Sequence, residues 1–575
     1  MLRLFRFLKP FRMAVLLVLV LTFFQVLSEL YLPTLMADIV DLGIVQADIP
    51  YILKIGGLML LVTAGGALCS VIASFLSSKV ASGFGKDLRS RIFTHVESFS
   101  LREFDQIGTA SLITRTTNDI TQIQQVLMMM LRMAVMAPMM CIGGVIMALS
   151  RDARLSWVIV AIIPILAGAI FTIARKGLPL FKAMQTKLDK LNRVTRENLT
   201  GIRVIRSFNR VGHEKKRFDF ANRDLMDTGI RVNRLMAAMM PTMMLVLNFS
   251  TIAIVWFGGI RIDHGNMQVG DLMAFIQYAM QIMFSLIMLS VIFVMIPRAS
   301  VSANRVREVL DLVPEITDAP QVREADGMKG TVEFRDVTFS YPGAEKPALS
   351  HISFRANPGE VTAIIGGTGS GKSTLIHLIP RFHDVDSGSV RVDGVDVREM
   401  SQETLRAKIG LVPQKAVLFT GTVAENIRYG KESATDEEIR HAAEIAQAAP
   451  FIAEMKDGYQ SLISQGGTNV SGGQKQRLSI ARALVRRPEI YIFDDSFSAL
   501  DFKTDANLRR ALKQETADST LLIVAQRVST VMDADRIIVL DEGKIAGIGT
   551  HHELMKTCDV YREIVSSQLS EEEIA

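Results

Sequence analysis

Residues 361–379 read VTAIIGGTGSGKSTLIHLI, and this stretch decides the fold of the second half of the chain. The apolar run Val361–Ile365 has the length of a buried strand, and Leu375–Ile379 reads as the start of an apolar helix. The glycines between them let backbone N–H groups converge on phosphate oxygens, and the helix that follows adds the positive end of its dipole. The stretch therefore predicts a strand, a phosphate-binding loop and a helix.

Two side chains at the end of this loop carry the expected chemistry. Lys372 has the reach to contact the β- and γ-phosphates of ATP, and the hydroxyl of Ser373 is placed to hold Mg²⁺. ATP and Mg²⁺ are therefore the expected ligands. The nucleotide-binding residues that we expect from this loop are Gly366, Gly367, Thr368, Gly369, Ser370, Gly371, Lys372, Ser373 and Thr374.

Two further motifs follow along the chain. Residues 490–495 read IYIFDD, an apolar strand that ends in two carboxylates, which a core strand does not need. We expect Asp494 to orient Mg²⁺ through water, and Asp495 stands where a general base for the attacking water would sit. The second motif is a helix start whose backbone suits phosphate, although alone it would be only a turn and a cap: Ser471, Gly472, Gly473 and Gln474.

The first half of the chain has the composition of a membrane domain. Six mostly apolar segments reach the length of about 20 residues that crosses the hydrocarbon core; they are residues 13–36, 51–78, 126–149, 156–175, 236–261 and 270–296. The basic residues before the first segment resemble those of a secretory signal, but Gln25–Pro33 offers no small-residue cleavage site. We therefore expect a retained helix, with Met1–Phe11 lying in the cytoplasmic interface of the membrane lipids.

The loops between these segments indicate the orientation. The second and fourth loops, about 79–125 and 176–235, are long and basic, whereas the first short loop, 37–50, contains aspartates and no basic residue. This asymmetry predicts a multi-pass membrane protein with both termini and both long loops in the cytoplasm. Arg151 and Arg154, in a short outer loop, are the exception.

Helical periodicity continues through both long loops. Two arms of about 20 residues per loop would extend about 30 Å below the membrane. The turns at their tips, near Glu103–Gly108 and Phe208–Glu214, would then meet the C-terminal domain and couple it to the membrane. Solvated loops are the alternative interpretation.

The chain of 575 residues is too long for a single core. We expect a transmembrane domain over 1–313, which ends in a cytoplasmic helix over 298–313, then a linker over 314–330 and a nucleotide-binding domain over 331–575. With a net charge of +5 and no stripe of basic and aromatic residues, a nucleic-acid partner is not expected. Three cysteines are too few for a disulfide framework or a four-ligand zinc site, so we interpret them as packed thiols.

The order of the motifs resembles the nucleotide-binding domain of ABC transporters, and the six-span domain resembles that of ABC exporters. The residues that carry the likeness are Tyr341, the phosphate loop, Gln414, Ser471–Gln474, Asp494 and Ser498–Asp501. The resemblance implies an α-helical membrane domain fused to an α/β ATPase domain. It also implies a head-to-tail dimer, in which the SGGQ signature of one subunit closes over ATP on the phosphate loop of the other.

The same resemblance assigns roles to individual residues. Tyr341 would stack on adenine, Gln414 would sense Mg²⁺ and the γ-phosphate, and Ser498–Asp501, with Asp501 at its end, would line the dimer seam. The implied activity is an ATPase coupled to transmembrane transport.

Two positions depart from the family pattern. The catalytic glutamate of the family is here Asp495, one methylene shorter, and its switch histidine is here Gln526, which cannot become an imidazolium. Both departures fall on the same ATP site, and the pattern is similar to the degenerate-site subunit of heterodimeric bacterial multidrug exporters. We therefore predict an impaired site on this chain and a second, non-identical half-transporter as its partner, with hydrolysis mainly at the shared site that the signature Ser471–Gln474 completes.

The sequence constrains the identity of the cargo less than any other property of the protein. Methionines are abundant in the third, fifth and sixth spans and suit a cavity that accepts many apolar shapes, although any one of them more often faces lipid or a neighbouring helix. Polar residues within the spans are more informative because they are costly there; the candidates are Glu29, Arg132, Asn248, Gln277 and Gln281. Glu29, near the outer end of its span, and Arg132, near the inner end, have the alternative of reaching headgroups or holding helices together, and for Arg132 this simpler interpretation is preferred.

The leading functional prediction is export of amphipathic compounds of the multidrug type. The first alternative keeps the fold and changes the cargo to lipid, peptide or siderophore. The second is a non-transport protein, an ATP-gated channel or a membrane-anchored regulator.

Overall fold

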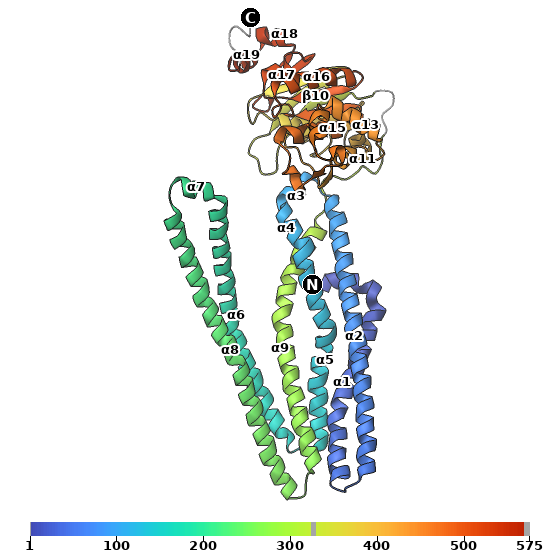
Figure 1. Cartoon of the computed structure of the whole chain (residues 1–575), viewed down its shortest axis with the longest axis vertical. Coiled ribbons are helices and arrows are strands. Elements are labelled where there is room, and N and C mark those ends of the chain that lie inside the picture. The colour runs from blue at the N-terminus through green and yellow to red at the C-terminus, as the bar shows by residue number, and fades with distance from the viewer. Residues whose placement is uncertain (1, 324–328, 569–575) are drawn as a thin grey trace. The chain divides into compact units, whose positions relative to one another are not determined.

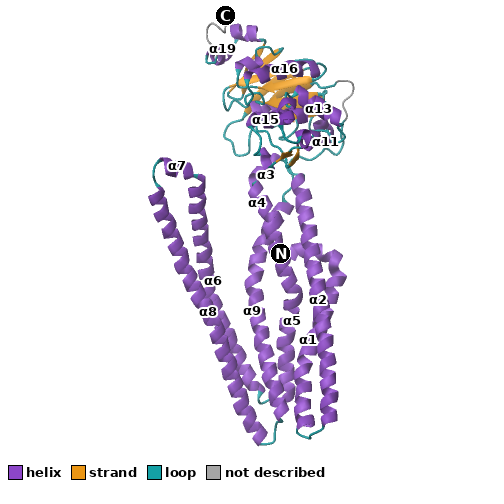
Figure 2. Cartoon of the chain, viewed as in Figure 1, coloured by secondary structure: helices purple, strands orange, loops and turns teal. Residues whose placement is uncertain are grey.

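The computed structural model describes residues 2–323 and 329–568, and these fall into two compact units. The first contains the chain up to Glu97 and then Gly108–Val313. The second contains Ser98–Ile107 together with the chain from Pro314 onward. The first unit is helical and the second combines helices with strands (Figure 2).

The membrane unit is built from long helices. In the described part of the chain six helices are long and apolar enough to cross a membrane, as the sequence predicted. The helices of this unit are η1 (Leu2–Phe11), α1 (Arg12–Asp38), η2 (Ile39–Ile44), α2 (Ile49–Glu97), α4 (Thr109–Thr114), η3 (Arg115–Asp119), α5 (Ile120–Arg151), α6 (Ser156–Thr200), α7 (Ile202–Ser207), α8 (Val211–Asp263) and α9 (Val269–Asp311).

Several of these helices run well past their apolar spans. Because few glycines or prolines interrupt the long loops, α2, α6 and α8 continue without a break into the expected arms. In the second of the two long loops, residues 176–235, the chain turns at Phe208–Arg210, directly after the short helix α7 (Figure 1). The sixth span and the helix expected over 298–313 form one continuous helix, because α9 runs through Pro297 and ends at Asp311.

Helices α1, α5 and α9 form the core of the membrane unit. Val26, Phe275 and Tyr278 are fully buried between them. Gly144 of α5 permits the close approach, because a Cβ atom there would lie 2.8 Å from Cγ1 of Ile282 on α9. Helices α6 and α8 run side by side as a long hairpin with α7 at its end (Figure 1).

The second unit contains two larger sheets within residues 329–568. A four-stranded antiparallel sheet has the order β2-β1-β4-β5, and a six-stranded sheet has the order β12-β11-β3-β10-β9-β6. In the second sheet only β12 is antiparallel to its neighbour. The strands are β1 (Val332–Phe339), β2 (Leu349–Ala356), β3 (Val361–Gly366), β4 (Ser387–Val392), β5 (Val395–Asp396), β6 (Ile409–Val412), β7 (Gly421–Thr422), β8 (Leu462–Ile463), β9 (Ile490–Asp494), β10 (Thr520–Val524), β11 (Arg536–Asp541) and β12 (Lys544–Gly549).

Helices cover the parallel sheet, as expected for strands that are apolar on both faces. Every residue of β9 and of β10 is buried. The helices of this unit are α3 (Leu101–Ile107), α10 (Lys372–Leu378), α11 (Gln402–Ala407), α12 (Val423–Arg428), α13 (Asp436–Ile445), α14 (Ala449–Glu454), η4 (Gly458–Gln460), η5 (Gln465–Gly467), α15 (Gly472–Leu484), α16 (Phe502–Glu515), α17 (Val528–Val531), α18 (His551–Thr557) and α19 (Asp559–Ser566).

The helix α3 belongs to this second unit although the chain on both sides of it belongs to the first. Arg102 of α3 donates to Oε1 of Glu315 at 2.5 Å, and the backbone N–H of Glu315 lies 3.4 Å from Oε1 of Glu103. Glu103 is buried and also accepts from the backbone N–H of Ser100. The tip of the first long loop is thus part of the compact C-terminal unit.

Candidate functional site

Four neighbouring parallel strands, β3, β10, β9 and β6, end at one edge of the large sheet. Ligands of open α/β sheets bind beyond the carboxyl ends of such strands. The phosphate loop follows β3, Asp494 ends β9 and is followed by Asp495, Gln526 comes after β10, and Gln414 comes after β6. The topology therefore brings together residues that are up to 160 positions apart in the sequence, since Gly366 and Gln526 both lie at this edge.

The phosphate loop has the conformation that its glycines permit. Gly371, directly before α10, has a φ of +97°, and a Cβ atom there would lie 2.8 Å from Cδ2 of Leu349. Lys372 Nζ donates to the carbonyl oxygens of Gly366 at 2.9 Å and Gly367 at 2.6 Å. The hydroxyl of Ser370 is buried and has no hydrogen-bond partner. A lysine folded over its own loop beside an unsatisfied hydroxyl fits a site for phosphate.

Two of the three expected Mg²⁺ residues, Ser373 and Asp494, are adjacent, whereas the third, Gln414, contacts Asp495. Ser373 Oγ lies 3.1 Å from Oδ1 of Asp494, so a hydroxyl and a carboxylate face each other at the loop. Oxygen donors of this kind suit Mg²⁺, which prefers a carboxylate, phosphate oxygens and water. Burial raises the pKa of Asp494, and the hydrogen bond from Ser373 opposes that rise. Burial also lowers the pKa of the Lys372 ammonium, and the negative charges of Asp495 and Asp494 oppose this by raising it.

The two residues that depart from the family pattern contact each other. Gln526 Nε2 donates to Oδ2 of Asp495 at 2.9 Å, and Gln414 Nε2 approaches the same oxygen at 3.3 Å. Asp495 has a φ of +46°, in the left-handed region that aspartate tolerates better than most residues. Two amides therefore share one oxygen of the shortened carboxylate. Burial raises the pKa of Asp495, and the hydrogen bond from Gln414 opposes that effect.

Tyr341 lies next to the phosphate loop. Its hydroxyl is 3.1 Å from Oγ1 of Thr374, and its ring is 40% exposed, which leaves room for a stacked base. Phe339 and His383 hold the ring at centroid distances of 5.0 and 5.5 Å in edge-to-face contacts. Sequence reasoning did not select His383, because no motif marks it.

The signature residues lie elsewhere in the unit. Ser471 caps α15 by accepting from the backbone N–H of Gln474, and the Gln474 side chain accepts from the backbone N–H of Ser471 in return. Asp501 caps α16 in the same way, accepting from Thr504. Within residues 2–323 and 329–568, no hydrogen bond or ion pair joins Ser471–Gln474 to Gly366–Thr374. A single chain therefore leaves the phosphate loop uncovered by its own signature.

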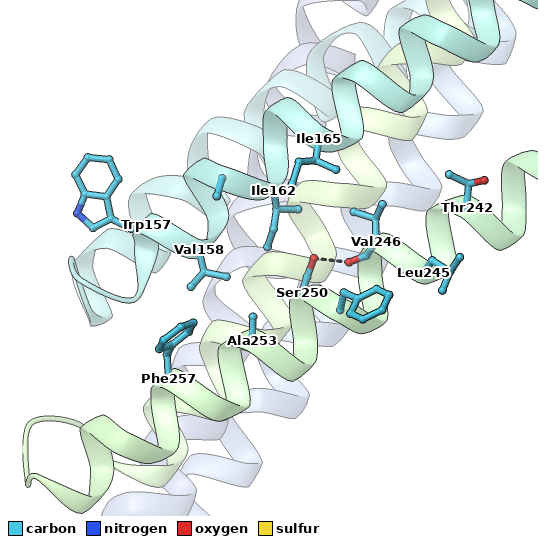
Figure 3. Close-up of a pocket in the computed structure, with 12 residues that line it drawn as sticks. Trp157, Val158, Ile162, Ile165, Thr242, Leu245, Val246, Ser250, Ala253 and Phe257 are labelled. Atoms are coloured by element: carbon cyan, nitrogen blue, oxygen red, sulfur yellow. Dashed lines mark hydrogen bonds between the residues drawn. The ribbon is translucent and has the colours of Figure 1, made fainter.

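In the membrane unit an apolar pocket of about 630 Å³ lies between α6 and α8 (Figure 3). Trp157, Ile162 and Phe257 line it, and Ser250 turns its hydroxyl to its own helix by donating to the carbonyl of Val246. Arg132 of α5 is not part of it. Instead it donates to the hydroxyls of two serines of α2, Ser74 at 3.2 Å and Ser70 at 3.4 Å, and thereby links the two helices.

The fold and this site define an ATP-binding domain fused to a six-span membrane domain. Comparison with known proteins agrees: the ABC transporter transmembrane region family matches residues 15–296, and the ABC transporter family matches residues 349–498. An "uncharacterized ABC transporter ATP-binding protein" of Mycobacterium tuberculosis is 46% identical over 565 residues, 97% of each chain. An "ATP-dependent lipid A-core flippase" of Desulfotalea psychrophila is 33% identical, over 93% of each chain.

A solved structure described as a bacterial Atm1-family ABC exporter with ATP bound has a TM-score of 0.81 and 25% identity, covering 97% of this chain and 99% of that one. This chain belongs to the ABC transporter family, as an exporter-type half-transporter with one membrane domain and one ATP-binding domain. It is a multi-pass membrane protein of the type that functions as a dimer, with an ATPase coupled to transport.

Proposed function

We propose that this chain is one half of a heterodimeric exporter of amphipathic compounds and that its own phosphate loop forms a hydrolytically impaired ATP site. The observation that carries the proposal is the contact between Gln526 and Asp495 at 2.9 Å. A general base must reach the attacking water, and a carboxylate one methylene short sits back by about 1 Å. Here that carboxylate is also bound by two amide donors, from Gln526 and Gln414.

The impaired site would still bind nucleotide. Lys372, Ser373 and Asp494 are present in the arrangement described above, so positioning of the phosphates and of Mg²⁺ does not depend on Asp495. When bound, Mg²⁺ would neutralise charge on the β- and γ-phosphates. Tyr341 would hold the base and Gln414 would monitor the γ-phosphate. A slow site of this kind can hold ATP between cycles.

The competent site would be shared with a partner. The capping box that presents Ser471–Gln474 is intact, so this signature can cover ATP on the phosphate loop of a second subunit. Two identical chains would instead combine two impaired sites. The intact signature and the altered base together therefore favour a non-identical partner.

Closure of the two ATP-binding domains would drive the membrane helices. The first loop tip belongs to the compact C-terminal unit through contacts such as Arg102 to Glu315. The second tip, around α7, exposes apolar side chains, including Val204 at 61% and Phe208 at 74%. Exposed apolar side chains on a long polar arm suit docking to another ATP-binding domain, and reorientation of the arms would open the spans outward. We place both tips in the cytoplasm of a bacterial cell, on the charge asymmetry of the loops.

Amphipathic cargo is supported by the pocket between α6 and α8 and by the methionines of α5, α8 and α9. Apolar, adaptable side chains tolerate many shapes. A lipid cargo is the second candidate, because the flippase relative of 33% identity is named for a lipid. Drug-stimulated as opposed to lipid-stimulated ATPase activity distinguishes the two.

Inverted membrane vesicles test the proposal. The chain is expressed alone, and also together with a similar half-transporter encoded beside it, with Lys372→Ala as the matched variant that loses nucleotide binding. We expect ATP-dependent uptake of amphipathic dyes only with both chains. Brisk hydrolysis and transport by the chain alone would refute both the heterodimer and the impaired site.

A further inference from the structure

Polar side chains gather at one place inside the membrane, on α1. Thr22, Gln25 and Glu29 follow at helical spacing, so they share one face of α1. Thr22 is 1% exposed, Gln25 is 6% exposed and Glu29 is half-buried. Glu29 lies about two and a half turns, or about 13 Å, before the end of α1 at Asp38. Its side chain is too short to cover that distance, so the carboxyl group stays at membrane depth.

Pro33 leaves a backbone acceptor on α1 that α9 satisfies. Proline has no N–H group, so the carbonyl of Glu29, four residues earlier, has no partner within its helix. Gln281 of α9 supplies one, donating from Nε2 to that carbonyl at 3.2 Å. One residue further, the hydroxyl of Tyr278 donates to the carbonyl of Leu30 at 3.1 Å. The side-chain amide donor of Gln281 is thus used on the backbone of α1.

The groups that remain at this place are mostly acceptors, although the hydroxyl of Thr22 can also donate. Gln25 donates its amide to Oε1 of Glu29 at 2.9 Å, which uses that donor as well. Oε1 of Gln281 and the hydroxyl of Thr22 are buried without a hydrogen-bond partner. An amide oxygen and a carboxylate can only accept.

The charge of this set is not balanced. The ion pairs near the outer ends of the spans join Arg151 to Asp271 and Arg261 to Asp152, and within residues 2–323 none is recorded for Glu29. An unpaired carboxylate and unpaired acceptors in a medium of low dielectric are costly. A positively charged or donor-rich group placed there would remove that cost.

We propose that the Glu29 cluster, formed by Thr22, Gln25, Glu29 and Gln281, binds the positively charged group of the cargo. This inference rests on the proposed export function and narrows its cargo to cationic amphipathic compounds. The carboxylate of Glu29 pairs with the cation, and the oxygen of Gln281 accepts from any N–H group that it carries. The apolar remainder of the cargo lies among the surrounding helices.

The experiment compares two lipophilic ions of nearly equal size and opposite charge, tetraphenylphosphonium and tetraphenylborate. Equilibrium binding is measured on the full chain in nanodiscs of a neutral phospholipid, with empty nanodiscs subtracted. Because a hydrogen bond or contact to a charged group is worth about 10- to 100-fold in affinity, Glu29→Gln should weaken binding of the cation at least about tenfold and leave the anion unchanged. Asp48→Asn, which removes one negative charge from the outer loop, is the matched control and should change neither.

Unchanged binding of the cation to the Glu29→Gln variant would overturn the cluster as a cation site and leave amphipathic export standing. Binding of neither ion to the wild-type chain, with no dye transport by the co-expressed pair, would overturn both. The wild-type chain offers a second readout if the variant does not fold. Dicyclohexylcarbodiimide, which modifies carboxyl groups in apolar surroundings, should label Glu29, and tetraphenylphosphonium but not tetraphenylborate should protect it. Labelling that is absent, or unaffected by the cation, would count against the proposal.

Discussion

Restoring the two altered residues of the ATP site is the sharpest test of the impaired-site proposal. In the structure the Asp495 carboxylate is one methylene short of a glutamate and accepts from Gln526 at 2.9 Å and from Gln414 at 3.3 Å. A retreat of about 1 Å from the attacking water costs on the order of 10²-fold in rate, or about 2.7 kcal/mol. The double variant Asp495→Glu with Gln526→His should therefore raise hydrolysis at this site about 30- to 100-fold.

The assay isolates this site by pairing each variant with a partner half-transporter whose own catalytic glutamate has been replaced by glutamine. Phosphate release then reports the site on Lys372. Asp495→Glu alone should gain less than the double variant, because Gln526 still binds the carboxylate, and contacting residues are not additive. Asp495→Asn is the isosteric control and should remain within about threefold of wild type, since the carboxylate that it removes already contributes little.

One structural cost has to be separated from the catalytic gain. Asp495 has a φ of +46°, and a glutamate tolerates this left-handed conformation less well, at a cost of about 1 kcal/mol. That cost is small against a domain stability of about 5–15 kcal/mol, and the thermal midpoint of each variant measures it. A double variant that binds ATP, keeps its thermal midpoint and still hydrolyses within threefold of wild type would refute the reasoning.

Four further predictions concern the same domain. Tyr341→Ala should weaken ATP binding about 10- to 100-fold through lost stacking, and Tyr341→Phe only severalfold, because it loses just the contact to Thr374; displacement of a fluorescent nucleotide measures both. Ser373→Ala should bring the ratio of ATP affinities with and without Mg²⁺ close to one, and a preserved ratio would exclude Ser373 as a Mg²⁺ residue. Burial lowers the pKa of Lys372 in the ATP-free chain and bound phosphate should raise it, so ATP binding should be accompanied by proton uptake and should weaken as the pH rises through the lowered pKa; calorimetry in two buffers of different ionisation enthalpy detects the uptake. Leu522→Ala, at a fully buried position of β10, should lower the free energy of unfolding by about 2–5 kcal/mol, measured by denaturation of the full chain in detergent.

Much of the fold follows from local sequence. The six spans are long apolar runs, and the phosphate loop is eight consecutive residues whose glycines have one plausible use. Continuous helical arms follow from a lack of breakers, as α2 and α8 illustrate. The expected fold class is confirmed. It could be predicted because each of these elements is specified by residues close to it in the sequence.

The remainder depends on contacts between distant residues, and no local pattern encodes them. The helix expected over 298–313 forms as far as Asp311, but the sequence does not show that it is continuous with the sixth span, because Pro297 is tolerated inside α9. The shared oxygen of Asp495 joins residues that follow β6, β9 and β10, and only the strand order brings these positions together. Likewise, the sequence marks Glu29 and Gln281 as polar residues in apolar spans, but it does not show that Pro33 frees the carbonyl that Gln281 binds.

The discontinuous make-up of the C-terminal unit bears on how the protein is made. During translation Ser98–Ile107 leaves the ribosome more than two hundred residues before the strands of its own unit. This segment is therefore made well before the residues that it packs against. A recombinant fragment that begins at Pro314 would lack it permanently and would leave Glu315 without Arg102. Soluble expression of such a fragment is expected to improve when the decapeptide 98–107 is supplied in trans or fused to its N-terminus.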